Sequence, residues 1–363
     1  MNELETARKI INDVDKQMAE LFEKRMYASE LVAKYKKEHG LSILDAAREK
    51  EVIRQNSEMI KNSVYQEYYA EFIKETMRIS RSYQSRLNEG QRVAYSGVEG
   101  AYAYIAAKKM YPSATLVPYS NFESAYSAVE NGECDVCVLP IENSYAGDVS
   151  TVMDLMFSGT LYVNQVLNLP ITHCLMVNEG VELKDVKRVV SHPQALAQCA
   201  GYIKEMGFEA EEKENTAKAA KSVFDNKLTD TAAIASQETA ELFGLKVLAS
   251  GINASRTNTT RFLAFSRAQN SINAQNRKMN QHFILMFTVK NEAGALAKTI
   301  DIIGAYGFNM RNLHSRPMKE LLWSYYFYVE AEGCIGSQAG KDMLRALGAT
   351  CDKLKLVGSY IQE

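Results

Sequence analysis

Residues that break helices are missing from the N-terminal part of the chain. Proline is absent before Pro112 and glycine before Gly40. Because these two residues interrupt helices more strongly than any others, their absence excludes a start rich in turns. The residues that are present predict a first helix over 4–38, a second that begins near Asp45 and a third over about 64–87.

Long apolar runs and an excess of charge of one sign are also missing. No apolar stretch approaches the roughly 20 residues that cross a bilayer, and the N-terminus lacks the apolar core of a signal peptide. The 363 residues carry a formal net charge of −2 without a polybasic run, which argues against nucleic acid as a partner. We therefore expect a cytoplasmic protein of two or three domains that binds neither membranes nor nucleic acid.

Cysteine is too scattered to indicate disulfides or a metal site. The six cysteines occur without a secretion signal, so reduced thiols are expected. Cys134 and Cys137 form a C-x-x-C, but the motif lies in a strand-like run without a second pair of ligands. The chain also lacks a dinucleotide fingerprint. We expect no metal and no organic cofactor.

One arginine interrupts an apolar seam on the first predicted helix. Alternating steps of four and three give Leu4, Ala7, Ile11, Val14, Met18, Leu21, Arg25, Ala28, Val32 and Tyr35. A helix of roughly 50 Å is too long to be covered within one compact unit of about 90 residues, so the seam predicts pairing with a second copy. Arg25 needs an anionic partner, because an unpaired buried charge is costly. An internal salt-bridge network, a device that fixes register and a pocket for a small dianion remain open.

Polar side chains recur three or four residues apart on shared faces of the predicted helices. They resemble the active-site set of the helical chorismate mutases over about residues 1–88. The matching residues are Arg8, Arg25, Lys36, Asp45, Arg48, Glu49, Ser80 and Gln84.

The resemblance implies an all-α mutase domain in an intertwined dimer. Arg25 and, from the partner subunit, Arg8 would hold the two carboxylates of the substrate. Lys36 and Gln84 would donate to the ether oxygen as its bond breaks, and Glu49 would hold the ring hydroxyl. The remaining contacts would come from the backbone at Asp45 and from Arg48 and Ser80. This set suits a pericyclic rearrangement, which needs a folded substrate and well-aimed donors rather than a base or nucleophile.

From Arg92 the sequence alternates short buried strands with helices, as in βαβ units. Helices are expected over 101–110 and 122–130. After a crossing strand within 167–177, others are expected near 195–206 and after Gln237. This order predicts a largely parallel sheet and two α/β lobes, with a cleft of the kind that small molecules favour.

Three polar motifs stand beside predicted strands in this region: P-I-E-N-S at 140–144, S-H-P-Q at 191–194 and N-T-T-R-F at 258–262. Each alone could be turn chemistry. Together with the glycine loop at 96–102 they resemble the prephenate dehydratases over about 92–268, whose two-lobed fold is like that of periplasmic binding proteins. The loop is looser than usual, with Val98, Ala101, Ala103 and Tyr104 at positions where proline, hydroxyl residues and histidine are common.

The resemblance implies loss of carbon dioxide and hydroxide from prephenate, which gives phenylpyruvate. Thr260 would donate a proton or hydrogen bond to the departing hydroxyl, a task that a weak acid can perform because aromatisation supplies the driving force. Arg261 would anchor a carboxylate, and Phe262 would pack against the ring. The cleft would be shaped by Glu142, Asn143, Ser144, Ser191, Gln194 and Gln198.

A polar, aperiodic stretch at 268–281 suits a linker, and the elements after it follow the order βαββαβ of a ferredoxin-like α+β module. Gly294, Ala295 and Leu296 begin a predicted helix, which packing alone could explain. The run L-H-S-R-P at 313–317 follows the next predicted strand. Both resemble the G-A-L and E-S-R-P motifs of amino-acid-binding ACT domains. The effector contacts would come from Gly294, Ala295, Leu296, His314, Ser315, Arg316 and Pro317, with His314 in place of the usual glutamate.

The whole chain resembles the bifunctional chorismate mutase/prephenate dehydratases, the P-proteins of bacterial phenylalanine biosynthesis in the shikimate pathway. The resemblance implies domains at 1–89, 90–268 and 282–363, isomerase and lyase activities, allosteric inhibition by L-phenylalanine and a homodimer or larger homo-oligomer. A preference for arogenate over prephenate remains open. So does a non-catalytic amino-acid sensor in which the helices only dimerise.

Overall fold

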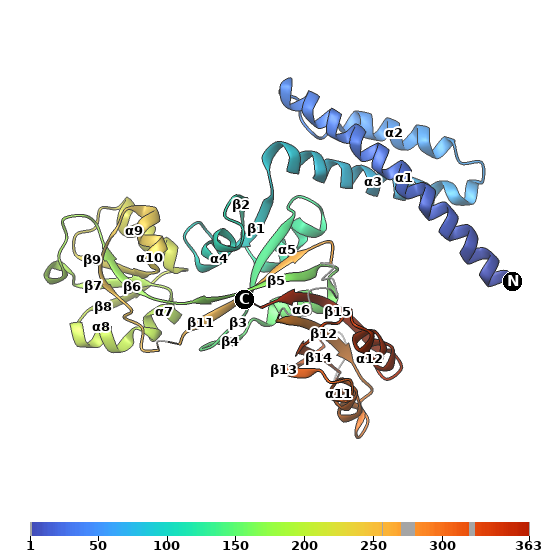
Figure 1. The fold of residues 1–363 in the computed structure, drawn as a ribbon. Helices are drawn as coiled ribbons and strands as arrows, with labels where there is room; N and C mark the ends of the chain where they lie inside the picture. The colour runs from blue at the N-terminus through green and yellow to red at the C-terminus, as the bar shows by residue number, and fades with distance from the viewer. Residues whose placement is uncertain (1, 256, 270–279, 319–323, 363) are drawn as a thin grey trace. The chain divides into compact units, whose positions relative to one another are not determined.

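The computed structural model describes residues 2–255, 257–269, 280–318 and 324–362 (Figure 1). It divides into two compact units, and each is described by itself. The smaller contains the chain up to Arg92 and two short later segments, and the larger contains the rest. The predicted linker at 268–281 lies mostly outside the described residues. In the described part of the chain, no helix has both the length and the apolar character to cross a membrane.

The smaller unit consists of the three predicted helices. Their bounds are α1 (Glu3–Glu38), α2 (Ala46–Glu58) and α3 (Ser63–Glu89). Each begins at a side chain that accepts a hydrogen bond from a free backbone N–H of the first turn: Asn2, Asp45 and Asn62. Both α1 and α2 pack against α3.

The apolar seam of α1 is uncovered in the single chain. Only Ser29 and Ala33 of this helix are buried. The larger seam residues are between 41% and 62% exposed: Leu4, Ile11, Val14, Met18, Leu21, Val32 and Tyr35. A continuous apolar face of this length is characteristic of an interaction surface.

The larger unit begins with a lobe of α/β structure. Its strands are β1 (Arg92–Ser96), β2 (Thr115–Tyr119), β3 (Val136–Asn143), β4 (Gly147–Asp148), β5 (Tyr162–Pro170) and β11 (Thr259–Ser266), and its helices are α4 (Tyr102–Met110), α5 (Phe122–Glu130) and α6 (Ser150–Ser158). β1 runs parallel to β3, whereas β11 lies antiparallel between β3 and β5. The chain reaches a second lobe after β5 and returns through β11.

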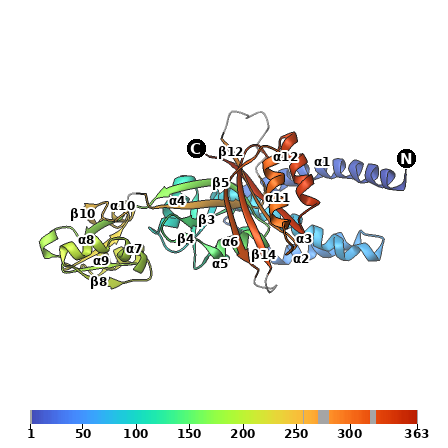
Figure 2. The same cartoon turned by 90° about the horizontal axis from the view of Figure 1, so that it is seen from below.

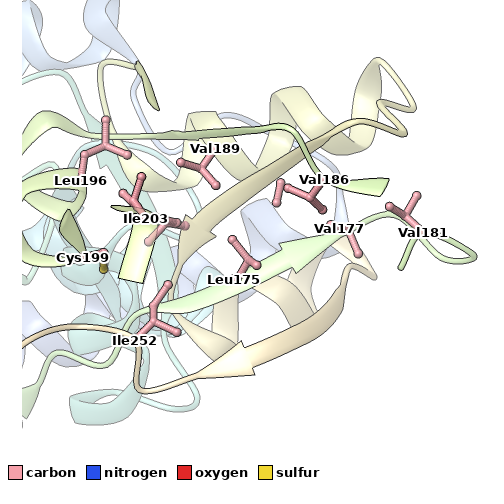
Figure 3. Packing of buried hydrophobic residues seen from close by; sticks show 11 residues of the cluster. Leu175, Val177, Val181, Val186, Val189, Leu196, Cys199, Ile203 and Ile252 are labelled. Carbon is pink, nitrogen blue, oxygen red and sulfur yellow. The ribbon is translucent and has the colours of Figure 1, made fainter. Parts of the chain in front are cut away.

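The second lobe has its own sheet, in the order β10-β6-β9-β7-β8. Its elements are β6 (Cys174–Val177), a 3₁₀ turn (Leu183–Asp185), β7 (Arg188–Ser191), α7 (Pro193–Gln198), α8 (Ala200–Met206), β8 (Glu209–Glu212), α9 (Thr216–Asp225), β9 (Thr231–Ala235), α10 (Gln237–Phe243) and β10 (Lys246–Ser250). One core cluster of this lobe joins β6 and β7 to α7 and α8, through side chains such as Leu175, Val189 and Ile203 (Figure 3). The predicted two-lobed architecture is thus present.

Two details of the prediction for this region are wrong. The sheets are mixed rather than largely parallel: β6 runs antiparallel to β9 and β10, and β11 runs antiparallel to both of its neighbours. The two reversed strands are those that follow the two crossings between the lobes: β6 comes after the first crossing and β11 after the second. The helix expected over 195–206 is split at Cys199, because the Ala254 N–H takes the carbonyl of Gln198 at 2.9 Å.

The C-terminal module has the predicted βαββαβ order. Its elements are β12 (Gln281–Thr288), α11 (Ala295–Ala305), β13 (Asn309–Pro317), β14 (Tyr325–Glu332), α12 (Gln338–Gly348) and β15 (Lys353–Ile361). The strands lie in the order β13-β14-β12-β15, with α11 and α12 on one face (Figure 2). One correction concerns residues 313–317, which form the second half of β13 instead of following a strand. Pairing with β14 continues as far as Pro317 opposite Tyr325, and this keeps the segment extended.

The sheet of this module continues into that of the first lobe. β15 pairs in parallel with β5, with Gly358 opposite Val163. A Cβ atom at position 358 would collide with the carbonyl oxygen of Val163, so the approach of the two backbones requires glycine there. Because β5 in turn pairs with β11, the module is joined to the strand that begins at Thr259.

Candidate active sites

Arg25 lies on α1 against α3, where its guanidinium finds neutral partners. It donates to the hydroxyl of Ser80 and, at 3.3 Å, to the carbonyl oxygen of Thr76. Among the described residues no carboxylate pairs with it. Burial lowers the pKa of Arg25, as expected for a cation without an anion. The internal salt-bridge network proposed for Arg25 is therefore absent from the described structure.

An apolar hollow of about 880 Å³ opens beside Arg25. Met18 and Leu21 of α1 and Phe72 and Ile73 of α3 contribute to its wall. Arg25 alone of the eight predicted mutase residues lines it. A single chain thus presents a cation at an apolar surface, and its partner Ser80 lies behind it, outside the lining.

Apart from Ser80, which accepts from Arg25, several of the predicted mutase residues bond to other groups in one chain. Lys36 donates to the carbonyl of Ile43 at 2.6 Å, and Asp45 caps α2 at the N–H of Arg48. Glu49 forms an ion pair with Arg81 of α3, a partner that the sequence reasoning missed. Side chains of this group that lie on α3 are buried, at 4% exposed for Ser80 and 7% for Gln84.

Two features of this group point to an incomplete site. The Oε1 atom of Gln84 is buried without a hydrogen-bond partner among the described residues. Arg8 is exposed and lies 17 positions before Arg25 on the same helix, a separation of about 25 Å at 1.5 Å per residue. Arg8 and Arg25 of one chain therefore cannot hold one small molecule together.

In the larger unit a cavity of about 330 Å³ lies between the two α/β lobes. Four of the predicted dehydratase residues line it: Asn143 and Thr260 from the first lobe, and Gln194 and Gln198 from the second. The lining contains Asp148, His173 and His192 but, among the described residues, no lysine or arginine.

Hydrogen bonds fix the orientation of the Thr260 hydroxyl. The amide nitrogen of Asn143 donates to Thr260 Oγ1 at 2.8 Å and to Asn258 Oδ1 at 2.9 Å. The side-chain oxygen Oδ1 of Asn143 accepts from the backbone N–H groups of Tyr145 and Ala146, and these bonds set the orientation of the side-chain amide. Since Thr260 Oγ1 accepts from Asn143, its own proton is available to a molecule in the cavity.

The network continues into the second lobe. Asn258 donates to Gln198 Oε1 at 3.0 Å, and His173 Nε2 lies 2.8 Å from the same oxygen. An amide oxygen only accepts, so His173 carries its proton on Nε2, and Nδ1 can accept from Tyr102 at 3.1 Å. Burial, partly offset by the bond to Gln198, lowers the pKa of His173 and favours the neutral ring.

Helix N-termini supply positive potential to this cavity. Residues at the start of α4, α6 and α9 line it, among them Tyr102, Val149 and Thr216. No side chain caps the first turn of α4 or α6. Free N–H groups at helix starts bind carboxylates and phosphates, so the cavity suits an anionic ligand even without a lining arginine.

Five predicted dehydratase residues lie outside the cavity lining: Glu142, Ser144, Ser191, Arg261 and Phe262. Ser144 instead bonds the backbone of Thr259 and Thr257, and Ser191 is fully buried and donates to the Ile234 carbonyl at 2.5 Å. Phe262 is 2% exposed in the core.

The prediction for Arg261 needs a specific correction. Its side chain lies on the other face of β11 from Thr260, as expected for successive residues of a strand. There it pairs with Glu330 of the C-terminal module. Arg261 therefore does not line the cavity as a carboxylate anchor in this structure.

The predicted effector residues lie in two segments of the C-terminal module, the start of α11 and the second half of β13. Gly294, with a φ of 82°, precedes α11, which begins with Ala295 and Leu296. On β13, His314 Nδ1 lies 2.8 Å from Asp148 Oδ2, and Arg316 donates to Ser150 Oγ at 2.6 Å. Ser315 and Pro317, on the alternate face, are exposed. His314 and Arg316 thus face the first lobe rather than an open site.

The family of the larger unit emerges from comparison with known proteins. A prephenate dehydratase family model matches residues 93–270, and a chorismate mutase type II model matches 7–85. The arogenate dehydratase/prephenate dehydratase 2 of Arabidopsis thaliana is 36% identical over 278 residues, which cover 74% of this chain and 72% of that protein. The chain belongs to the prephenate dehydratase family.

Within this family it also carries a mutase domain. The bifunctional chorismate mutase/prephenate dehydratase of Buchnera aphidicola is 28% identical over 377 residues, which cover 100% of this chain and 97% of that protein. The crystal structure of a prephenate dehydratase from Arthrobacter aurescens, in complex with L-Phe, is 28% identical and has a TM-score of 0.67. The match covers 75% of this chain and 90% of the Arthrobacter aurescens chain. The chain is thus an enzyme with chorismate mutase and prephenate dehydratase domains.

Several residues of this dehydratase cavity were missed from the sequence. Asn258 stands in the N-T-T-R-F motif, and its position beside Thr259 was the only available signal. Tyr102 ends the glycine loop at 96–102 but was not named as a site residue. His173 comes from the predicted crossing strand, and no periodicity or spacing links it to Thr260. Among the described residues, no group of three histidine, cysteine, aspartate or glutamate side chains could hold a metal ion.

Proposed function

We propose that the chain rearranges chorismate to prephenate in its helical unit and converts prephenate to phenylpyruvate in the cavity between the two lobes. The observation that carries the second assignment is the Thr260 hydroxyl, which faces the cavity and is oriented by Asn143 at 2.8 Å. The isomerase and lyase steps would follow one another on one polypeptide in phenylalanine biosynthesis.

In the dehydratase step the ring carboxylate leaves as carbon dioxide. The electron pair of that bond enters the ring, which becomes aromatic as the C–O bond to the ring hydroxyl breaks. Thr260 donates to the departing oxygen, and Asn143 stabilises charge that develops on Thr260 Oγ1. The helix starts at Tyr102 and Val149 would hold the substrate's negative charge.

In the mutase step Arg25 would hold one carboxylate of chorismate and the partner subunit's Arg8 the other. Lys36 and Gln84 would donate to the ether oxygen, and Glu49 would bind the ring hydroxyl. Asp45, Arg48 and Ser80 complete the proposed set. A homodimer, formed over the exposed seam of α1, would bring these residues together.

The proposed domains are 1–89 for the mutase, 90–268 for the dehydratase and 282–363 for an ACT regulatory domain. The βαββαβ order of the last supports this assignment. L-Phenylalanine would bind there between subunits, through residues of the G-A-L and H-S-R-P motifs, and would favour a less active state. Calorimetric titration with phenylalanine tests this, and an absence of binding heat and of inhibition would contradict it.

Thr260→Ala tests the dehydratase assignment. Loss of the only proposed proton donor should lower the dehydratase kcat by about 100-fold or more. Chorismate mutase activity of the same preparation serves as the control for folding and concentration, and it should be unchanged. A variant that still forms phenylpyruvate at the normal rate, or that loses both activities while folded, would contradict the assignment.

Arogenate is the second candidate substrate, because a relative that is 36% identical is named for both arogenate and prephenate. The two substrates give different products in the same step: phenylalanine from arogenate and phenylpyruvate from prephenate. Measurement of kcat/KM for arogenate and for prephenate under the same conditions shows which of the two the enzyme prefers.

A further inference from the structure

Arg261 connects the strand of the proposed proton donor to the C-terminal module. It directly follows Thr260 on β11, but its guanidinium points to the opposite side. There Nη2 donates to the carboxylate of Glu330 on β14 and, at 2.6 Å, to the hydroxyl of Tyr360 on β15. The residue beside Thr260 is therefore held by two strands of another domain.

Glu330 depends on Arg261 for its charge balance. Its side chain is 2% exposed, and that of Arg261 is 18% exposed. Tyr360 and Tyr328 both donate hydroxyl protons to the Glu330 carboxylate. His282 lies 3.8 Å away, but burial lowers its pKa, so the ring stays neutral at neutral pH. Among the residues that the structure describes, Arg261 is thus the cation that compensates this buried carboxylate, and removal of either partner leaves the charge of the other uncompensated.

Burial alone would lower the pKa of Arg261, but the hydrogen bond and negative charge of Glu330 outweigh burial and raise it. The guanidinium is therefore committed to Glu330 and stays charged. Such a bond between rigid strands restricts how β11 can shift along or across the sheet.

Two further contacts attach the module to the first lobe, and one of them is at the cavity. Gly358 of β15 meets Val163 of β5, the strand beside β11, in an approach that excludes any side chain at position 358. His314 of β13 contacts Asp148, which lines the cavity. The module therefore touches the cavity's supports at more than one point, and Arg261 is the contact nearest to Thr260 in sequence.

We propose that Glu330 is a positioning residue for Thr260 that acts through Arg261, so that the C-terminal module is a structural part of the dehydratase site as well as a candidate sensor. This inference rests on the proposed role of Thr260. Its rival is the role of substrate anchor for Arg261, in which the side chain would leave Glu330 and reach into the cavity.

The two roles predict different kinetics. Displacement of a donor by a fraction of an ångström to about 1 Å lowers the rate of the chemical step by up to about 100-fold and affects binding little. Loss of a carboxylate anchor weakens substrate binding, so it raises KM. The ratio of the change in kcat to the change in KM therefore distinguishes positioning from anchoring.

The first experiment compares Glu330→Gln with Glu332→Gln in the full-length protein. Glu332 is on the same strand and pairs with the exposed Arg311, so it is a matched control. For Glu330→Gln we expect the dehydratase kcat to fall by about 10- to 100-fold, with KM for prephenate changed by less than about threefold. Glu332→Gln should behave as the wild type, and mutase activity should be unchanged in both.

Two further variants test the same proposal if Glu330→Gln folds poorly. Tyr360→Phe removes one hydroxyl from the Arg261–Glu330 contact without burying a new charge, and should lower kcat by a few-fold at constant KM. Arg261→Lys keeps the charge but loses the fork that reaches two partners, and should lower kcat in the same manner.

Wild-type kcat in a folded Glu330→Gln, or a rise in KM at unchanged kcat in Arg261→Lys, would overturn the positioning role. Thr260→Ala is measured alongside, and it distinguishes a failure of the positioning role from a failure of the proposed function. If Thr260→Ala remains active, the dehydratase assignment itself is wrong. If it is inactive while Glu330→Gln is fully active, only the positioning role is refuted.

Discussion

At the scale of single residues, Arg25 shows how a side chain can lower the stability of the fold and still be useful for function. A cation on an apolar seam loses hydration, and its partners in one chain are a hydroxyl and a carbonyl. Neither neutralises its charge. Such an arrangement is costly for a folded protein, but it presents an unneutralised guanidinium to a ligand carboxylate, for which bidentate recognition is strong.

Arg25→Leu separates these two contributions. Leucine completes the apolar seam, so the dimer should be at least as resistant to heat as the wild type. Mutase activity should fall by about 100-fold or more, because a substrate carboxylate loses its donor. Thermal unfolding measures the change in stability and the mutase rate measures the change in activity. Dehydratase activity is the internal control. Retention of the normal mutase rate would reduce Arg25 to a device that fixes helix register.

Individual roles were harder to infer than residue types. Thr260, Asn143 and Gln194 belong to the local motifs, and Gln198 came from the family resemblance; all four line the cavity. Arg261 was selected by the same reasoning, yet it faces Glu330, about 70 positions away along the chain. Sequence order shows that neighbours on a strand point in opposite directions, but not what lies on each side. That information depends on the tertiary partner.

At the scale of elements, local signals were sufficient wherever periodicity or capping decided the structure. The three helices of the smaller unit and the βαββαβ order of the last module follow from apolar spacing and from breakers such as Gly40. Strand direction did not follow from these signals. β6 and β11, which follow the two crossings between lobes, run against their neighbours, and a crossing leaves no mark in local composition.

The junction between β15 and β5 is a further element that no local pattern revealed. Gly358→Ala tests it, because the added Cβ would collide with the Val163 carbonyl and must push the two strands apart. We expect a loss of stability of about 1–3 kcal/mol for the larger unit, the typical cost of overpacking. Dehydratase kcat should fall with it, because β11 shares this sheet.

Gly348→Ala is the matched control for this variant. Position 348 ends α12, and a Cβ there would meet no atom within 4 Å. Alanine at that position should leave the thermal midpoint unchanged or slightly higher. If Gly358→Ala has the same midpoint and the same dehydratase rate as this control, then the two sheets are not tightly joined in solution.

At the scale of the whole molecule, the chain combines two kinds of site that make different demands on structure. The dehydratase cavity is formed within one chain, between lobes joined by two crossing segments. The helical unit presents its arginine on an uncovered apolar face. In a single chain Arg25 contacts Ser80, but Arg8 of the same helix lies too far away to join them. The first site thus depends on contacts between domains of one chain, whereas the proposed mutase site depends on a second subunit that supplies Arg8.

The central claim is that both reactions occur on this one chain, and one measurement tests it most directly. Chorismate is supplied to the purified full-length protein at neutral pH, and chorismate, prephenate and phenylpyruvate are followed over time against an enzyme-free control. The account predicts that prephenate rises and falls while phenylpyruvate accumulates, and that Thr260→Ala stops at prephenate. Chorismate that stays unchanged, or prephenate that persists with the wild-type protein, would contradict it.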